Sequence, residues 1–354
     1  MKVAIVAPLW ERVPPRGYGA VETHLGSLAD GLVERGHSVT LFASGDSITK
    51  ARLRAVCRRS LNEDLELSTY EQEAYRLLRL IDVRRESHSF DAIASHTRLT
   101  LAFLGDGDTP LLHTVHGRLT LDNVRVLQGF PAVPLIAVSN AQRATAPQIK
   151  YRSTIYPGVD LRLLPFRARP ASPPYLAFLG RLTHSKGAHV AIEVARRVGI
   201  PVKLAGRVKP QDRPYFEDRI RPELDGGSVE FLGELGPAGR SELLGGAVAT
   251  LFPSLLPEPF GLVLAESLAC GTPAIALAGG AEREILTPTS GFIAQSVLDM
   301  VTAVANVVTL DRRACRKRVE HCFAAPRMVD DYEAALRDVV ADRRATRVHP
   351  SQAR

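Results

Sequence analysis

The fold is decided by residues 248–278, which read VATLFPSLLPEPFGLVLAESLACGTPAIALA. An apolar run at 248–252 is followed by a proline-bounded loop, and a segment of helical period begins near Phe260. A second apolar run follows at 274–278. Short apolar runs that alternate with helical segments are typical of parallel α/β sheets. We therefore expect a strand, a loop, a helix and a second strand here.

The same alternation runs through the whole chain and predicts two sheets. In the first half, the expected strands are Lys2–Ala7, Ser38–Ala43, Ala92–Ser95, Leu111–Val115, Leu135–Val138 and Thr154–Tyr156. In the second half, they are Tyr175–Leu179, Val202–Ala205, Val229–Leu232, Val248–Phe252 and Ala274–Ala278. Between the first two strands, apolar residues at positions 21, 25, 28 and 32 form one stripe of a helix.

The proline-rich stretch PFRARPASPP at 165–174 separates the two series and predicts a linker. We expect two doubly wound α/β domains, at 1–168 and 169–327. A helix at 328–345 is expected to pack back on the first domain, and the tail 346–354 to be loose. Ligands of such sheets bind beyond the carboxyl ends of the strands, so the cleft between the domains is the expected site.

Composition excludes several classes of protein. The chain has 354 residues, 45% hydrophobic and 23% charged, which is typical of a globular protein. No apolar run approaches the ~18 residues of a membrane span, and the first apolar run is too short for a signal peptide. Four cysteines cannot form a disulfide framework, which favours a reducing, cytoplasmic location. The net charge of +7 is spread out, so we expect no nucleic-acid partner.

The helix expected near Phe260 offers the first candidate site. Glu258 lies just before the helix and Glu266 about two turns inside it. The backbone N–H groups of Phe260, Gly261 and Leu262 stand at the positive end of the helix dipole, which suits a phosphate or sugar hydroxyls. The alternative is an acidic helix start with no function.

The second candidate is GRLTHSKG at 180–187, directly after a strand. Arg181 and Lys186 in this glycine-bounded turn could hold a diphosphate, the first bidentately and the second as a point charge. The order Lys-Gly excludes a Walker loop. The alternative is a solvated turn with two ordinary charges.

Two segments of the first half complete the candidates. RGYGAVE at 16–22 contains Gly17 and Gly19, but Glu22 stands where a dinucleotide motif has its third glycine. A flexible loop that closes over a ligand fits better than a nicotinamide site. In HTVHGR at 113–118, a neutral His116 at a strand end could exchange a hydrogen bond with a sugar hydroxyl, although structural histidines are common.

Taken together, these motifs resemble the retaining GT-B glycosyltransferases of family four, the glycogen-synthase-like and mannosyltransferase-like group. The resemblance covers nearly the whole chain. It is carried by GYGAVE at 17–22, TVHG at 114–117, AVSNAQ at 137–142, YPGVD at 156–160, FLGRLTHSKG at 178–187, VEFLG at 229–233, the two glutamates seven residues apart, and ACGTPA at 269–274.

The resemblance implies a role for each candidate. Arg181 and Lys186 bind the nucleotide diphosphate, Glu258 holds hydroxyls of the transferred sugar, and Glu266 holds the ribose. Amides at Phe260, Gly261 and Leu262 meet sugar or phosphate oxygens, the loop of Gly17 and Gly19 lies beside the diphosphate, and His116 lies near the reacting carbon. The implied reaction moves a hexose from a UDP- or GDP-sugar to a hydroxyl acceptor with retention, and needs no metal or cofactor.

Two departures from the family pattern bear on the donor site. The loop GGAERE at 279–284 lacks the usual proline and has its glutamates out of step, which puts local donor contacts in doubt. Arg207 stands where a small or acidic residue usually follows Gly206, so base recognition is expected to differ.

Other functions stay open on the sequence alone. A nucleotide-sugar epimerase or a phosphorylase would use the same architecture, and a catalytically silent nucleotide-sugar-binding subunit would keep part of the site. The sequence carries no legible signal for the acceptor, which is left open as a small-molecule, glycan or lipid-linked acceptor, or for the oligomeric state. Arginines at 52, 54, 58 and 59 could touch anionic lipid, but a solvated helix face is favoured over membrane contact.

Overall fold

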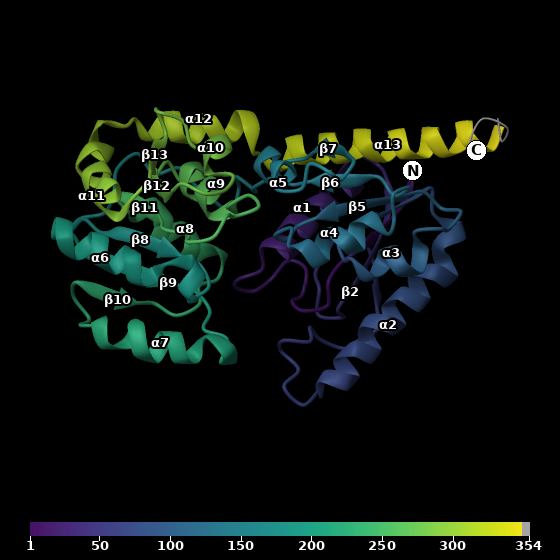
Figure 1. Cartoon of the computed structure of the whole chain (residues 1–354), viewed down its shortest axis with the longest axis horizontal. Coiled ribbons are helices and arrows are strands. Elements are labelled where there is room, and N and C mark those ends of the chain that lie inside the picture. Colours follow the sequence, from purple (N-terminus) through teal and green to yellow (C-terminus); the bar gives the residue numbers. More distant parts are fainter. Residues whose placement is uncertain (349–354) are drawn as a thin grey trace. The chain divides into compact units, whose positions relative to one another are not determined.

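The computed structural model describes residues 1–348, with side chains up to residue 345. The described chain forms two compact units (Figure 1). The first unit contains Met1–Pro15, Gly19–Gly158 and the segment that begins at Ala325, and the second contains Arg16–Tyr18 and Val159–Ala324. The division therefore falls after Gly158, ten residues before the boundary expected from the prolines. Each unit is described by itself below.

The first unit is built on a seven-stranded parallel sheet with the order β3-β2-β1-β4-β5-β6-β7. Its central strands are continuous apolar runs because helices cover both faces of such a sheet. β1, β4 and β5 are almost wholly buried. The strands are β1 (Lys2–Val6), β2 (Ser38–Ala43), β3 (Arg52–Ala55), β4 (Ala92–Ser95), β5 (Leu111–Val115), β6 (Leu135–Ala137) and β7 (Tyr151–Thr154).

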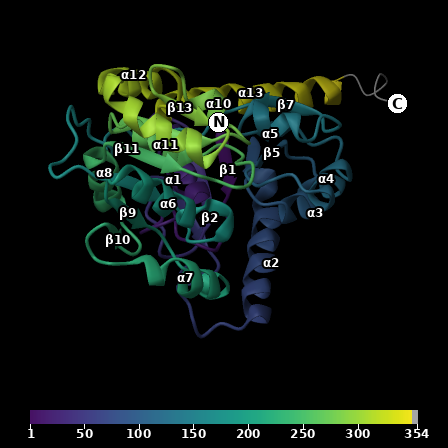
Figure 2. The ribbon, with the colours of Figure 1, turned by 60° about the vertical axis from the view of Figure 1, so that its left-hand side comes forward.

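The helices of the first unit cover the two faces of this sheet. They are α1 (Ala20–Glu34), α2 (Thr69–Glu86), α3 (Leu99–Leu104), α4 (Leu121–Gln128), α5 (Asn140–Ala144) and α13 (Ala325–Val348). One core cluster joins α1 and α13 to the sheet, and a second joins α2, α3 and α4 to the opposite face. Figures 1 and 2 both show α2 and α13 on opposite sides of the sheet.

The helix α13 is packed tightly into the first unit. Gly31 of α1 leaves no room for a Cβ, because that atom would lie 2.6 Å from the Val329 side chain of α13. Tyr332, Val329 and Leu336 are fully or almost fully buried. Burial of each such side chain contributes about 1.5–3 kcal/mol, so the helix is an integral part of this core.

The second unit is built on a six-stranded parallel sheet with the order β10-β9-β8-β11-β12-β13. Its strands are β8 (Leu176–Leu179), β9 (Val202–Ala205), β10 (Val229–Phe231), β11 (Ala249–Phe252), β12 (Ala274–Leu277) and β13 (Gly291–Ala294). Its helices are α6 (Ala188–Val198), α7 (Arg213–Arg219), α8 (Pro237–Gly246), α9 (Leu262–Ala269), α10 (Glu282–Ile285), α11 (Val297–Asn306) and α12 (Arg312–Cys322).

Both sheets reverse their direction of winding after their third strand in chain order, because the fourth strand pairs with the free side of the first. The strand order is 3-2-1-4-5-6 in the second unit, which is the doubly wound Rossmann order, and the first unit extends the same order by a seventh strand at its edge. The predicted fold class is therefore confirmed. In this fold, ligands bind at the carboxyl ends of the strands beside the reversal, which lies between β1 and β4 in one unit and between β8 and β11 in the other.

Several local predictions were wrong. The last strand of the first sheet is β7, which ends at Thr154 rather than beginning there, and the edge strands β3 and β13 were not predicted. β3 contains Arg52 and Arg54, so these arginines do not lie on a helix face as expected. The proline-rich stretch packs on the second unit, where the backbone N–H of Arg167 donates to the carbonyl of Cys270 (3.0 Å).

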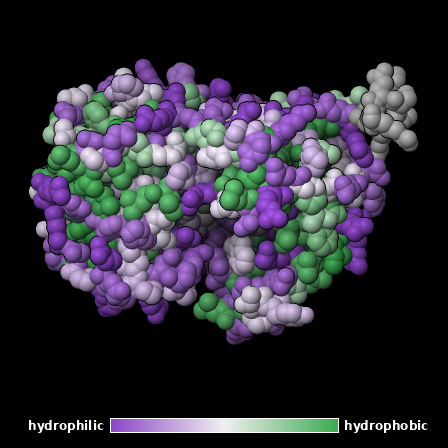
Figure 3. Space-filling view, in the orientation of Figure 1, coloured by the Kyte–Doolittle hydropathy of each residue, from purple (hydrophilic) through white to green (hydrophobic). Residues whose placement is uncertain are grey.

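The chain end and the surface add two observations. α13 runs to Val348, so residues 346–348 of the expected loose tail are helical, and residues 349–354 lie outside the described part. Within that part, no helix is both long and apolar enough to cross a bilayer. Hydrophobic side chains are exposed over α2 (Figure 3). Leu78 of this helix is 47% exposed. Scattered exposure of this kind is ordinary and carries no function by itself.

Candidate active site

The strands beside the reversal of the second sheet lead directly into the candidate residues. Arg181 follows the end of β8 by two residues, and Lys186 ends a single 3-10 turn before α6. Glu258 lies in the loop between β11 and α9. Because β8 and β11 are paired in parallel, both loops leave the same edge of the sheet.

Lys186 and Glu258 meet in the structure. The Lys186 ammonium nitrogen lies 2.6 Å from Oε1 of Glu258, and the hydroxyl of Ser254 donates to the same oxygen at 3.0 Å. Each of the paired side chains is about one-fifth exposed (21% and 18%). The cation and the carboxylate, predicted from separate motifs, therefore form one partly open ion pair that a ligand can reach.

The two loops are also joined through their backbones. The N–H of Leu255 donates to the carbonyl of Ser185 at 2.8 Å. Gly187 adopts a left-handed conformation (φ 74°), and a Cβ at this position would collide with the carbonyl of Pro253. Only glycine combines this φ with so close an approach at low cost. The turn that carries Lys186 and the loop that carries Glu258 are therefore held as one body.

A glycine also fixes the backbone of Glu258 from the other side. A Cβ added at Gly280 would lie 2.5 Å from both the backbone N and the backbone O of Glu258. The N–H of Ala281 donates to that carbonyl at 3.2 Å. At Gly279, by contrast, an added Cβ would meet no atom within 4 Å. The loop that departs from the family pattern therefore supports Glu258.

The glutamate of this departing loop caps its own backbone. The N–H groups of Gly279 and Gly280 each donate to one carboxylate oxygen of Glu282 at 2.7 Å. Glu282 is 2% exposed, so its side chain is committed to the loop. The sequence put local donor contacts in doubt because the glutamates of this loop are out of step with the family pattern. In the structure, Glu282 binds the backbone of its own loop.

Arg181 has a carboxylate partner of its own. Its Nε lies 3.5 Å from Oδ2 of Asp212, which follows β9 along the chain, and its side chain is about one-third exposed. The structure thus places Arg181 and Lys186 in one loop but pairs each with a different acid. Asp212 carried no sequence signal because it stands in a polar, proline-bounded segment.

Glu266 lies in α9 and is 5% exposed. Its Oε1 is 3.4 Å from the Arg240 guanidinium of α8. Burial raises the pKa of Glu266, and Arg240 opposes that rise without cancelling it. Arg240 was missed, because a cation 26 residues earlier on another helix has no local sequence signature.

The start of α9 differs from the prediction. The helix begins at Leu262 with Gly261 as its N-cap (φ 96°), two residues later than expected. The Phe260 side chain is buried and packs on Phe323, with ring centroids 5.6 Å apart. Phe260 thus anchors the loop in the core, while Gly261 and Leu262 occupy the positive end of the helix dipole.

Gly17 and Arg207 meet at Glu234 in the second unit. Arg207 Nε donates to one oxygen of Glu234 at 2.7 Å, and the backbone N–H of Tyr18 donates to the other at 2.6 Å. A Cβ at Gly17 would overlap the same carboxylate. Gly19 belongs to the first unit, where it is the N-cap residue of α1.

His116 lies in a histidine cluster of the first unit. It follows β5, and its Nε2 is 2.8 Å from Nδ1 of His96, which follows β4. His24 of α1 lies against both rings, with ring centroids 5.1 and 5.6 Å away. Its Nε2 is 3.1 Å from the hydroxyl of Tyr332, which in turn is 2.9 Å from the hydroxyl of Thr114.

Burial determines the charge of this cluster. It lowers the pKa of His116 to about 4 and that of His24 and His96 well below the usual value for histidine. All three rings are therefore neutral near pH 7. One ring nitrogen from each lies within 4.8 Å of the other two, which makes this the metal-compatible group found among the described residues. His24 and His96 were missed because single histidines on an apolar helix face and after a buried strand read as core residues.

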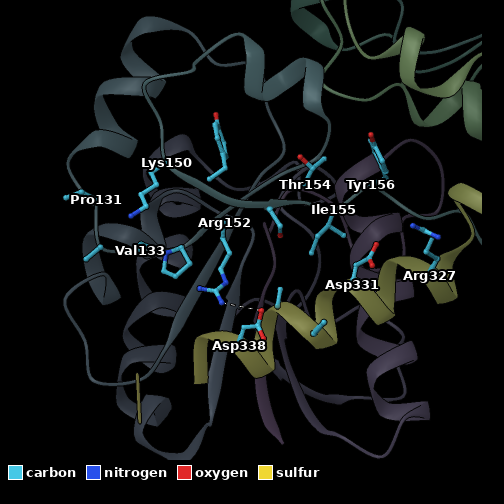
Figure 4. Close-up of a pocket in the computed structure, with 16 residues that line it drawn as sticks. Pro131, Val133, Lys150, Arg152, Thr154, Ile155, Tyr156, Arg327, Asp331 and Asp338 are labelled. Carbon is cyan, nitrogen blue, oxygen red and sulfur yellow. Dashed lines mark ion pairs between the residues drawn. The ribbon is translucent and has the colours of Figure 1, made fainter. Parts of the chain in front are cut away.

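A cavity of about 780 Å³ lies elsewhere in the first unit (Figure 4). It is lined by the loop before β6, by β7 and by α13, and Arg152 pairs with Asp338 across it at 3.3 Å. None of the sequence-predicted site residues lines it. Its position along an edge strand, rather than at the reversal of the sheet, separates it from the candidate site.

Comparisons with known proteins agree with this organisation. Residues 19–163 match the model "Glycosyltransferase Family 4", and residues 164–319 match "Glycosyl transferases group 1". A glycogen synthase of Mycobacterium tuberculosis is 26% identical over 275 residues, covering 70% of this chain. The match spans 64% of that relative's own length.

Solved structures share the fold. AviGT4, a glycosyltransferase involved in avilamycin A biosynthesis, is 24% identical with a TM-score of 0.71, covering 96% of this chain and 98% of its own. HepE of Anabaena, solved in complex with UDP and glucose, is 19% identical with a TM-score of 0.74, covering 96% and 100%. With both halves of the chain matched by the family models, the protein belongs to the family-four glycosyltransferases of GT-B fold.

Proposed function

We propose that this glycosyltransferase moves a hexosyl group from a nucleoside diphosphate sugar to a hydroxyl acceptor, with retention of configuration. The second unit binds the donor. The observation that carries the proposal is the Lys186–Glu258 ion pair at the reversal of the sheet. A ligand with both a diphosphate and a sugar can replace both halves of this ion pair. The diphosphate offers an anion to the lysine, and the sugar offers hydroxyl donors to the glutamate.

Donor binding divides this ion pair between two groups of one ligand. The Lys186 ammonium turns to the diphosphate, and the Glu258 carboxylate accepts hydrogen bonds from hydroxyls of the sugar. Ser254 and the backbone contacts at Gly280 keep Glu258 in place during the exchange. Ion-pair strength that is lost on binding is thereby replaced by charge-assisted hydrogen bonds to the donor.

The leaving group explains why cations gather here. When the sugar leaves, negative charge builds up on the diphosphate, and Lys186, Arg181 and the N-terminus of α9 stabilise it where it develops. This proposal assigns charge stabilisation to the chain itself and requires no metal ion for transfer.

The nucleoside is proposed to reach Glu266. Its buried carboxylate accepts from the ribose hydroxyls, and Arg240 favours the ionised form of this carboxylate against the effect of burial. We propose that the nucleoside of the donor is uridine or guanosine. UDP is the first ligand to test because HepE was solved with it.

Retention is proposed to proceed by attack of the acceptor on the face from which the diphosphate leaves. The departing phosphate takes the acceptor's proton, and Glu258, still held by Ser254, accepts hydrogen bonds from the sugar hydroxyls rather than acting as a nucleophile. His116, neutral at pH 7, is proposed to exchange a hydrogen bond with the transferred sugar.

The proposal is tested by titrating the full chain with UDP and then incubating it with UDP-hexoses, first alone and then with candidate acceptors. We expect UDP to bind, slow donor hydrolysis without acceptor, and a retained linkage in any product. Isomerisation of the donor would identify an epimerase, and no binding of any nucleoside diphosphate would exclude a nucleoside diphosphate sugar as the donor. Either result would overturn the proposal.

A further inference from the structure

Three histidines converge in the first unit from three separate elements. His24 comes from α1, His96 from the end of β4 and His116 from the end of β5. Each offers a ring nitrogen within 4.8 Å of those of the other two. We propose that this cluster is a three-histidine site for a divalent transition metal of the Zn²⁺ class. The proposal concerns a binding site that the sugar-transfer proposal does not require.

Two buried nitrogens in the cluster lack a hydrogen-bond partner among the described residues: Nδ1 of His24 and Nε2 of His96. The two side chains are 1% and 5% exposed, so bulk water does not serve these atoms. A buried, unsatisfied polar atom costs about 1–3 kcal/mol. A cation bound to Nδ1 of His24 would recover that cost at this atom, since neutral imidazole nitrogens are ready donors to zinc.

The surroundings of His24 fix which of its nitrogens is free to bind. Nε2 lies 3.1 Å from the Tyr332 hydroxyl, which is anchored in turn by Thr114 at 2.9 Å. When Nε2 carries the proton and donates it to Tyr332, Nδ1 keeps its lone pair for a metal. Metal-bound histidines almost always have such a partner on the second nitrogen.

The spacing requires only a small adjustment. Two nitrogens bound to one tetrahedral zinc lie about 3.3 Å apart, given zinc–nitrogen bonds of about 2.0–2.1 Å. The present contact between His96 Nδ1 and His116 Nε2 is 2.8 Å, and one nitrogen of each ring lies within 4.8 Å of one nitrogen of each other ring. Rotation of the partly exposed His116 ring would open space for the ion and leave one position for water.

The ligand set selects the metal. Neutral imidazole suits zinc, cobalt, nickel and copper, whereas magnesium and calcium prefer oxygen ligands. If His116 faces the sugar as proposed above, a metal held there would withdraw it from the donor. We therefore infer that the metal inhibits transfer, and this second statement rests on the proposed function.

The test is a titration of the chelator-treated full chain with Co²⁺, read by its visible absorption, followed by displacement with Zn²⁺. We expect one ion per chain. His24→Asn and His96→Asn should each weaken binding at least about tenfold, and Tyr332→Phe, which removes only the orienting hydroxyl, should weaken it about tenfold while keeping the three rings.

Two matched controls locate the ion. His88→Asn changes an exposed histidine of the same unit. His189→Asn removes one ring of the stacked His184–His189 pair in the second unit, whose centroids are 5.0 Å apart. Neither should affect binding, and thermal melting should show all variants folded. Absent Co²⁺ binding, or binding that survives His24→Asn and His96→Asn or is lost in His189→Asn, would overturn the site. Binding without inhibition would leave the site intact and contradict only the inhibitory role.

Discussion

The two units share the order of their first six strands, but the side chains at the reversal of the sheet are charged in the second unit and neutral in the first. At the reversal of the second sheet, each charged candidate side chain is half of an ion pair: Lys186 with Glu258, Arg181 with Asp212, and, on the adjoining helices, Arg240 with Glu266. At the corresponding strands of the first sheet, the polar groups are neutral imidazoles and hydroxyls. The fold therefore decides where a ligand binds, and the side chains decide which charge it carries.

Lys186→Ala tests this contrast most severely. It removes the cation nearest Glu258 and leaves that carboxylate without its partner, so both diphosphate stabilisation and sugar positioning suffer. We expect kcat to fall by about 10²–10³-fold, as when one preorganised donor to a developing anion is lost. The measurement is donor turnover, together with thermal melting to show that the chain folds.

Lys203→Ala is the matched control, because Lys203 also belongs to a lysine–glutamate pair of the second unit, with Glu230 at 3.2 Å. It should change turnover less than about twofold, since exposed pairs contribute about 0–1 kcal/mol. Equal losses in the two variants would mean that the site depends on overall charge rather than on Lys186.

Two adjacent glycines test whether the position of Glu258 matters. Gly280→Ala would place a Cβ against the Glu258 backbone, whereas Gly279→Ala would place one in open space. Overpacking of this kind costs about 1–3 kcal/mol. If the added Cβ displaces the backbone of Glu258, kcat should drop about tenfold or more in Gly280→Ala. It should stay near wild type in Gly279→Ala. Similar rates in both variants would show that Glu258 tolerates displacement.

Glu266 and Arg240 predict how UDP binding depends on pH. The ionised carboxylate accepts ribose hydroxyls, and its pKa is raised by burial, so affinity should fall as the pH drops through that raised value. Arg240→Gln removes the charge that opposes the rise in the pKa of Glu266, so the fall in affinity should begin at a higher pH than in the wild type. Glu266→Gln should bind UDP about tenfold more weakly and lose this pH dependence.

Calorimetry across pH separates these outcomes. Arg197→Gln is the control, since Arg197 is an exposed arginine paired with Glu193 at 2.6 Å on α6. It should leave the pH profile where it is in the wild type. A profile that is unmoved in Arg240→Gln would show that Arg240 does not keep Glu266 ionised.

The sequence predicted the parts of the fold that are buried on both faces. β1, β8 and β11 are continuous apolar runs because helices cover both sides of a parallel strand. Edge strands lack that signal: β3 reads RLRA, β7 reads YRST, and both are largely exposed or half-buried. They were missed or misplaced for the same physical reason.

The site followed a similar rule. Lys186 and Glu258 could be identified because each stands just after a buried strand, where the fold places ligands. Their partners could not: Arg240 reaches Glu266 from another helix, and His24 reaches His96 across 72 residues of chain. Such pairings depend on tertiary packing, which no local spacing encodes.

The smallest expected effect concerns the neutral histidines of the first unit. UDP carries the diphosphate but lacks the transferred hexose, and a neutral imidazole in the first unit offers it no charge. His116→Asn should therefore change UDP affinity by less than about twofold, on the order of 0.4 kcal/mol. Lys186→Ala, measured in the same titration, should weaken UDP binding about tenfold or more, because a charge-assisted contact contributes about 1.5–3 kcal/mol. If His116→Asn weakened UDP binding as much as Lys186→Ala does, the imidazoles would share in diphosphate recognition, and the division of charge between the two sheets would fail.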